Sequence, residues 1–202
     1  MEQVAIEILR PEDIAETASL LARAMGPNPV NTAVYKVDAE KKQRLQEERF
    51  ALVLTKRPGL TFVARSNGRV VGVLRIIKWP DCRSASPQNP TQSQAAPVSE
   101  TDIPGRVQTW MSVWGSHDPR EPHWHFGPFA VEPEMQRQGI GSRLFTRCCE
   151  EVDRNWEASY LETDRIENVR RYERFGFSVV AEDYVFDAKS WFMWRPARGK
   201  NL

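Results

Sequence analysis

The chain has 202 residues, and 41% of them are hydrophobic, so it is long and apolar enough for one domain with a real core. Its 28 basic and 27 acidic residues nearly cancel to a formal net charge of +1, which gives no global attraction to nucleic acid or to an anionic membrane. The longest apolar stretches, such as residues 70–74, are far too short to span a bilayer, and the N-terminus does not read as a secretory signal.

The cysteines favour a reducing compartment. Cys82, Cys148 and Cys149 are odd in number and two of them are adjacent, which is no disulfide framework. His123 and His125 form an H-x-H pair, but no second ligand pair follows at a useful spacing. We therefore expect a cytoplasmic protein that holds no metal.

Hydrophobic periodicity and turn residues predict the elements of the first eighty residues. A strand with alternating apolar residues precedes two amphipathic helices, which end at Gly26–Pro29 and at Pro58-Gly59. Asn67-Gly68 then joins two β-rich runs, and because both residues tolerate positive φ, a β-hairpin is predicted. The expected elements are a strand over 4–9, helices over 11–25 and about 39–56, and strands over 60–65 and 69–78.

The composition changes after this hairpin. Between Pro80 and about Val98, proline and small polar residues replace the large apolar ones, which predicts a mobile loop. A helical pattern over 101–114 carries Trp110 and Trp114, and this segment is expected to lie over another part of the protein rather than inside the sheet. We interpret residues 80–122 as a flexible insertion in one domain that spans residues 1–202.

The C-terminal half alternates between strands and helices. Ile140, Leu144, Cys148, Val152 and Trp156 recur every four residues, which predicts a helix with one buried face. The expected elements are a strand over 124–131, a helix from 139 to about 156, a strand over 159–163, a helix over 168–175, and strands over 177–180 and 190–194 joined through a loop. This order predicts a mixed sheet with helices on both faces.

Residues 136–142, QRQGIGS, connect a predicted strand to a predicted helix. A helix N-terminus carries unpaired backbone N–H groups and a partial positive charge, and glycine lets a phosphate approach the backbone. The segment lacks the third glycine of a dinucleotide-binding fingerprint, because position 144 is Leu, and it is no G-K-[ST] phosphate loop. Alone, it predicts either an anion site or a plain glycine-containing turn.

Two separated motifs carry a resemblance to a known family. Gln136-x-x-Gly139-x-Gly141 and the later Asn168 with Tyr172-Glu-Arg-Phe-Gly-Phe resemble the two signatures of the GCN5-related N-acetyltransferase (GNAT) superfamily. The resemblance covers residues 60–80 and 120–195. Within the superfamily, four segments are most similar to the puromycin N-acetyltransferase branch: Glu121–Trp124, Leu161–Thr163, Tyr172–Arg174 and Trp191–Arg195.

The resemblance implies an α+β fold with three layers (α/β/α) and a mixed, mostly antiparallel sheet with a splayed central strand pair. The gap between the strands at 124–131 and 159–163 would admit the pantetheine arm of acetyl-CoA, the acyl donor, and Asn168 would anchor that arm. The other residues expected to bind acetyl-CoA are the strand backbone at Phe129, Ala130 and Val131, and the pyrophosphate turn at Gln136, Arg137, Gln138, Gly139, Gly141 and Ser142.

Three residues are candidates for catalysis. Tyr172 lies four residues after Asn168, so both share one helical face, and its phenol would donate a proton to the departing sulfur of CoA. A core aromatic is the other interpretation of Tyr172. The amine must lose a proton, and His125 and Glu162 are the candidate bases. A hydrogen-bonded strand histidine and a structural salt bridge are the alternatives for these two residues.

Together these features predict an acetyl-CoA-dependent N-acetyltransferase that acts on a primary amine of a small molecule by direct attack. The alternatives are a CoA-binding sensor without transfer activity and an enzyme that acetylates proteins or peptides. The insertion at 80–122 would form a lid, and Trp110, Trp114 and Trp191 could wall an aromatic substrate pocket, although plain packing is the favoured interpretation of each one taken singly. We expect no nucleic-acid or membrane partner, and a monomer or homodimer.

Overall fold

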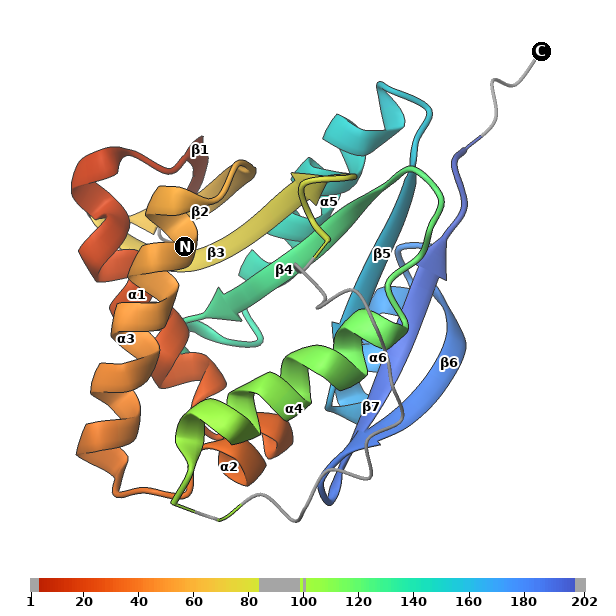
Figure 1. Cartoon of the computed structure of the whole chain (residues 1–202). Coiled ribbons are helices and arrows are strands. Elements are labelled where there is room, and N and C mark those ends of the chain that lie inside the picture. The colour runs from red at the N-terminus through yellow and green to blue at the C-terminus, as the bar shows by residue number, and fades with distance from the viewer. Residues whose placement is uncertain (1–3, 84–98, 100, 199–202) are drawn as a thin grey trace.

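The computed structural model describes residues 4–83, 99 and 101–198, and it consists of one sheet between two layers of helices (Figure 1). The sheet has the strand order β1-β2-β3-β4-β5-β7-β6. Neighbouring strands are antiparallel except for β4 and β5, which are parallel. The strands are β1 Ala5–Ile8, β2 Leu60–Ser66, β3 Arg69–Lys78, β4 His123–Val131, β5 Ala158–Thr163, β6 Ser178–Val185 and β7 Ala188–Arg195.

Four helices cover one face of the sheet and two cover the other (Figure 1). The first group is α1 Ile14–Met25, α2 Pro29–Val34, α3 Ala39–Lys56 and α4 Ile103–Ser116, and the second is α5 Ile140–Asp153 and α6 Ile166–Glu173. Short 3-10 turns at Pro11–Asp13 and Pro133–Met135 complete the helical elements of the described residues. The predicted three-layer α+β fold is confirmed. None of the described helices is long and apolar enough to cross a membrane.

The core follows from strand alternation in the central strands. In β3, Val73 packs toward α1 and α3, whereas Leu74 and Ile76 join the cluster around α5. Successive side chains of a strand point to opposite faces, so a strand with helices on both sides is apolar throughout. The hairpin before β3 has the predicted turn, with Asn67 at φ 47° and Gly68 at φ 79°.

The central strands separate where the chain bulges. Pairing between β4 and β5 ends at His125 opposite Tyr160, although both strands continue beyond that point. On the other side of β4, Leu74 faces Phe129 and Ile76 faces Phe126, so β4 holds one extra residue around the cis Gly127-Pro128 peptide. Such a bulge bends its strand, and Figure 1 shows β4 diverging from β5. The predicted splayed pair is therefore present.

Two elements differ from the sequence prediction. The segment at 26–29 ends α1 as expected, but Pro29 also opens α2, a position where proline's fixed φ suits a helix. The loop expected between 180 and 190 is wrong, because β6 and β7 pair as far as Val185 opposite Ala188. β6 is an edge strand whose residues are mostly exposed, so it carries little apolar signal.

Candidate active site

A left-handed glycine sets up the N-terminus of α5. Gly139 is the N-cap with φ 82°, and Arg137 also has a positive φ, so the backbone turns sharply before the helix. The first helical bond runs from the Arg143 N–H to the Gly139 carbonyl, and no side chain caps the helix. The N–H groups of Ile140, Gly141 and Ser142 therefore have no partner within the helix. These donors, with the helix dipole, suit an anion.

These donors open into a groove of about 460 Å³, the α5 groove, which runs from the end of β4 past the turn at 135–142 to α6. The groove is also basic, because Arg137, Arg165 and Arg171 line it. Of the residues expected to bind acetyl-CoA, the structure brings together along this groove Phe129, Ala130, Val131, Gln136, Arg137, Gly139, Gly141, Ser142 and Asn168. Gln138 does not line it, and its side-chain amide lies 3.5 Å from the Glu134 carbonyl oxygen.

The sequence interpretation missed Arg165 and Arg171, although a signal was present. Both lie three residues from Asn168, and residues at that spacing share a helix face. Two residues of the turn also have structural roles that the sequence interpretation did not include. The Gln136 amide donates to the Val131 carbonyl at 3.1 Å, so this side chain ties the turn to β4. A Cβ at Gly141 would lie 2.9 Å from Cζ of Phe129, so glycine is required here for helix–strand contact as well.

A second hollow of about 200 Å³, the central cavity, lies between the splayed strands, α3 and α4. Met25, Asn28, Phe129 and Asn168 line both hollows, so the α5 groove leads into the central cavity. Asn168 itself donates to the Thr163 hydroxyl at 3.4 Å. The junction of the two hollows is where a reactive group carried by a groove-bound ligand would meet a second molecule.

Tyr172 lines the central cavity close to this junction. Tyr172 is 5% exposed and stacks on Phe145 with ring centroids 4.8 Å apart, so it packs in the core, and it also lies where a proton donor to the cavity would have to be. Burial raises the pKa of the Tyr172 phenol well above its ordinary value. The hydroxyl is therefore protonated at neutral pH and can donate.

His125 and Glu162, the two candidate bases, are partners in the structure. Nε2 of His125 lies 2.8 Å from Oε2 of Glu162, and both residues line the central cavity. Burial lowers the pKa of His125, but the charge of Glu162 and hydrogen bonds with Cys82 and Glu162 raise it more, to about 10. His125 is thus an imidazolium at neutral pH, and its pKa is not the ordinary value that the sequence interpretation assumed.

Asp118 completes this cluster and was missed from the sequence. One ligand-type atom each of Asp118, His125 and Glu162 lie within 4.8 Å of one another, a donor set that a divalent ion can use. Nearby, Sγ of Cys82 lies 3.5 Å from Nε2 of the buried His123. Asp118 sits in the polar turn between α4 and β4, and Glu162 lies on the distant β5, so no local pattern relates the three residues.

Aromatic side chains of α4 wall the central cavity. Trp110 and Trp114 both line it and contact each other edge to face, with ring centroids 5.1 Å apart. The indole N–H of Trp114 donates to the Ser190 hydroxyl at 3.1 Å, which fixes that ring. Trp191 lies on β7, packs against the core cluster around α5 and lines neither hollow, so plain packing is the interpretation that fits this residue.

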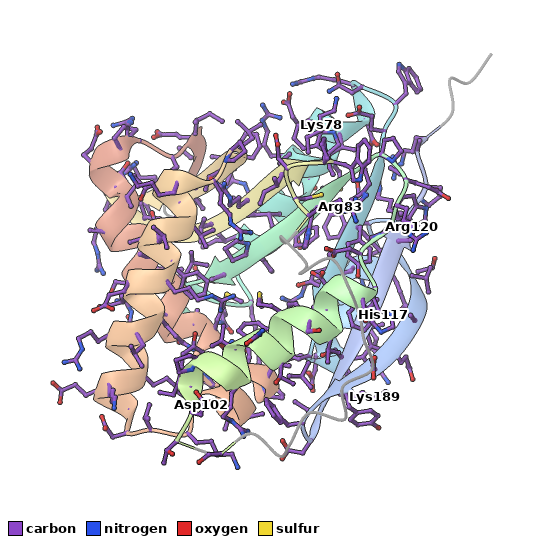
Figure 2. The ribbon with its side chains drawn as sticks, in the orientation of Figure 1. Lys78, Arg83, Asp102, His117, Arg120 and Lys189 are labelled. Carbon is purple, nitrogen blue, oxygen red and sulfur yellow. The ribbon has the colours of Figure 1, made fainter. Side chains whose placement is uncertain are left out.

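Polar contacts hold α4 in place over the cavity. At its C-terminal end His117 stacks on Phe192 at 4.0 Å and lies 2.8 Å from Oδ2 of Asp183, beside β7 (Figure 2). Nearer its N-terminal end the buried Arg106 donates twice to the Ala33 carbonyl, at 2.6 and 3.2 Å. Much of the mobile loop predicted for 80–98 lies outside the described residues.

Comparisons with known proteins give a consistent result. Residues 21–177, well over half of the chain, match the model of the acetyltransferase (GNAT) family. The fold is similar to that of the histone acetyltransferase HPA2 and related acetyltransferase from Corynebacterium glutamicum, with a TM-score of 0.72, 21% sequence identity and 100% of each chain covered.

Two further solved structures share the fold at lower similarity. The ribosomal-protein-S18-alanine N-acetyltransferase from Escherichia coli has a TM-score of 0.56 and 16% identity, with 99% of each chain covered. The protein yncA from Salmonella typhimurium, solved with its cofactor acetyl-CoA, also has a TM-score of 0.56 and 16% identity, with 98% of this chain and 96% of that chain covered.

Proposed function

Because the chain belongs to the GNAT family of acetyltransferases, we propose that it transfers an acetyl group from acetyl-CoA directly to a primary amine of a small molecule. The observation that carries this proposal is the junction of the two hollows. A basic groove at a helix N-terminus suits a pyrophosphate, and it leads past Asn168 into a cavity that holds Tyr172 and a carboxylate-rich cluster. Donor and acceptor would therefore meet beside a proton donor.

The groove residues fit acetyl-CoA by charge and shape. Arg137, Arg165 and Arg171, with the N–H groups of the first turn of α5, would hold the pyrophosphate. The splayed end of β4, at Phe129–Val131, leaves backbone groups unpaired by β5 for the pantetheine amides, and Asn168 would orient the arm toward the cavity. When bound there, acetyl-CoA supplies an activated acetyl carbon with a thiolate as leaving group.

The carboxylates of the central cavity would receive the amine. At neutral pH an alkylamine is an ammonium ion. Asp118 and Glu162 against one His125 imidazolium leave the cluster with one net negative charge, which matches one ammonium. Because His125 is already protonated, Glu162 takes the ammonium proton in this proposal, and the contact with His125 at 2.8 Å orients Glu162.

Tyr172 would complete the transfer on the leaving-group side. Its hydroxyl is protonated and faces the cavity, so it donates to the sulfur as the carbon–sulfur bond breaks. The burial that raises the pKa of this phenol raises that of a thiol beside it in the same way, so the buried thiolate is a stronger base than it would be in water.

A small acceptor is favoured over a protein. The cavity measures about 200 Å³ and α4 covers it, whereas a peptide needs an open groove. The resemblance to the puromycin N-acetyltransferase branch stays a prediction, and the substrate of that branch is not carried over to this chain. Two of its segments, Leu161–Thr163 and the start of Tyr172–Arg174, contribute residues to the cavity wall.

The test is an acceptor screen with acetyl-CoA, read as free thiol and as acetylated product by mass. We expect calorimetric binding of CoA and turnover with at least one class of primary amine. Tight CoA binding without transfer to any amine would favour the sensor alternative, and transfer to peptides alone would favour a peptide acetyltransferase. A folded protein with no affinity for CoA would overturn the proposal.

A further inference from the structure

Resting on the proposed function, we propose that the acceptor has two charged ends: a primary amine at one end and a carboxylate at the other, joined by an apolar and preferably aromatic middle. The central cavity carries side chains of both charges, which match the two ends of such a molecule. Two of its carboxylates, Asp118 and Glu162, lie together beside His125, and two of its arginines, Arg49 and Arg57, line it from α3 and the end of α3.

The anionic end is the floor of the cavity. The Glu162 side chain is 5% exposed and His125 is 20% exposed, so this end is shielded from solvent. Asp164 also lines the cavity, but it is buried and its carboxylate accepts from the Val30 N–H at 2.8 Å at the start of α2. The floor that faces an amine is therefore Asp118 and Glu162, as proposed above.

The cationic end is the wall formed by α3. Arg49 and Val53 lie four residues apart on one face of α3, Arg57 follows as the C-cap of this helix, and all three line the cavity. The Arg49 guanidinium lies 4.4 Å from the Trp110 ring centroid and 3.9 Å from Sδ of Met111, so α4 holds it in position. Arg57 is exposed at the C-terminal end of α3.

A third arginine adds positive charge behind this wall. Arg75 is 2% exposed and donates to the Thr61 hydroxyl and to the carbonyl oxygens of Arg57 and Pro58, at 3.0, 2.6 and 2.9 Å. Burial and the nearby Arg57 lower its pKa. In the described part of the chain no carboxylate forms an ion pair with Arg49, Arg57 or Arg75. Arginines without carboxylate partners beside a cavity suit an oxyanion, because the guanidinium fork matches a carboxylate.

The two ends of the cavity are separated by about the length of a small molecule. Trp110, which contacts Arg49, precedes Asp118 by eight residues, and Asp118 follows shortly after the end of α4 at Ser116, so at the helical rise their Cα atoms lie about 12 Å apart along the axis of α4. Trp110, Met111 and Trp114 form the apolar wall between them. An α-amino acid, whose amine and carboxylate are adjacent, would be too short to reach both ends.

A matched pair of acceptors tests this arrangement: para-(aminoethyl)benzoate and the corresponding primary amide, which has the same shape and no charge. We expect kcat/KM to favour the benzoate by roughly tenfold or more, the effect of a charged hydrogen bond. Arg49→Gln and Arg57→Gln should each reduce this ratio, and the double variant should bring it to about one. Arg44→Gln, an exposed arginine on the same helix, is the control and should leave the ratio unchanged.

Two controls keep the outcomes distinct. Arg57 is exposed, so its variant is expected to fold even if loss of Arg49 disturbs the packing on Trp110. The preference for the benzoate should also weaken at high salt, because charges at the cavity mouth are screened. Equal rates for benzoate and amide, or a preference that survives in the double variant, would overturn this inference alone. Failure of these and all plain amines to react would overturn the proposed function as well.

Discussion

The pairing of His125 with Glu162 leads to a prediction that can be tested without a substrate. In Glu162→Gln the charge that stabilises the imidazolium disappears while the burial that disfavours it remains. Two unit charges about 4 Å apart interact by about 4 kcal/mol at the effective dielectric of a protein site, which corresponds to a pKa change of about 3. The pKa of His125 should therefore fall from about 10 to about 7 in the variant, with Asp118 as the remaining nearby carboxylate.

Imidazole proton–nitrogen NMR, recorded across pH on the wild type and the variant, measures this directly. The matched control is Asp183→Asn, which removes the carboxylate partner of His117 at 2.8 Å and should leave His125 unchanged. A wild-type His125 that titrates at its ordinary pKa of about 6.5, or one that titrates equally in both proteins, would refute the reasoning.

The same shift predicts a pH dependence of stability. The folded-state pKa of His125 is raised, so its contribution to the free energy of unfolding is complete below the unfolded pKa of about 6.5 and is lost as pH rises to about 10. Denaturant unfolding of the wild type should show this decline across that window, and Glu162→Gln should show less of it.

Three further predictions concern the donor side. Tyr172→Phe should lower kcat roughly 100-fold with CoA affinity little changed, whereas Tyr184→Phe, an exposed tyrosine on β6, should have no effect on kinetics; equal turnover in both variants would remove Tyr172 from its acid role. Gly139→Ala places a residue with a Cβ at φ 82°, which should lower the free energy of unfolding by roughly 1–2 kcal/mol in denaturant unfolding. The same variant should bind CoA more weakly. Gly141→Ala should destabilise the fold through contact with Phe129, and adding Phe129→Leu should recover part of the loss; no recovery would mean that the contact is not the cause.

Much of the fold and of the proposed donor site could be predicted because the sequence patterns that specify them are local. Asn67-Gly68 specifies its turn by conformational preference alone, and Gly139 specifies the left-handed N-cap of α5 in the same way. Asn168 and Tyr172 share a helix face by spacing, so placing the helix places both. The elements that were missed, α2 and most of β6, are short or exposed and depend on tertiary pairing rather than on their own pattern.

The proposed acceptor side could be predicted only in part, because its charged residues come from separate segments. His125 and Glu162 were candidates from their places on predicted strands, whereas Arg49 of α3 and Asp118 of the turn after α4 look like ordinary charged residues in their own segments. Whether these residues form a site depends on the distances between them, which are known only from the folded structure.

His125 and Glu162 show what such distances change. Considered separately, the histidine is a base with a pKa near neutrality and the carboxylate is a competing base or a salt bridge. At 2.8 Å the two act together, since the carboxylate keeps the imidazole protonated and the imidazolium holds the carboxylate in place. The question of which residue is the base then becomes a question about one charged cluster. With Asp118 beside them, the proposed mechanism would have this cluster bind the ammonium form of the acceptor, and proton removal would follow binding.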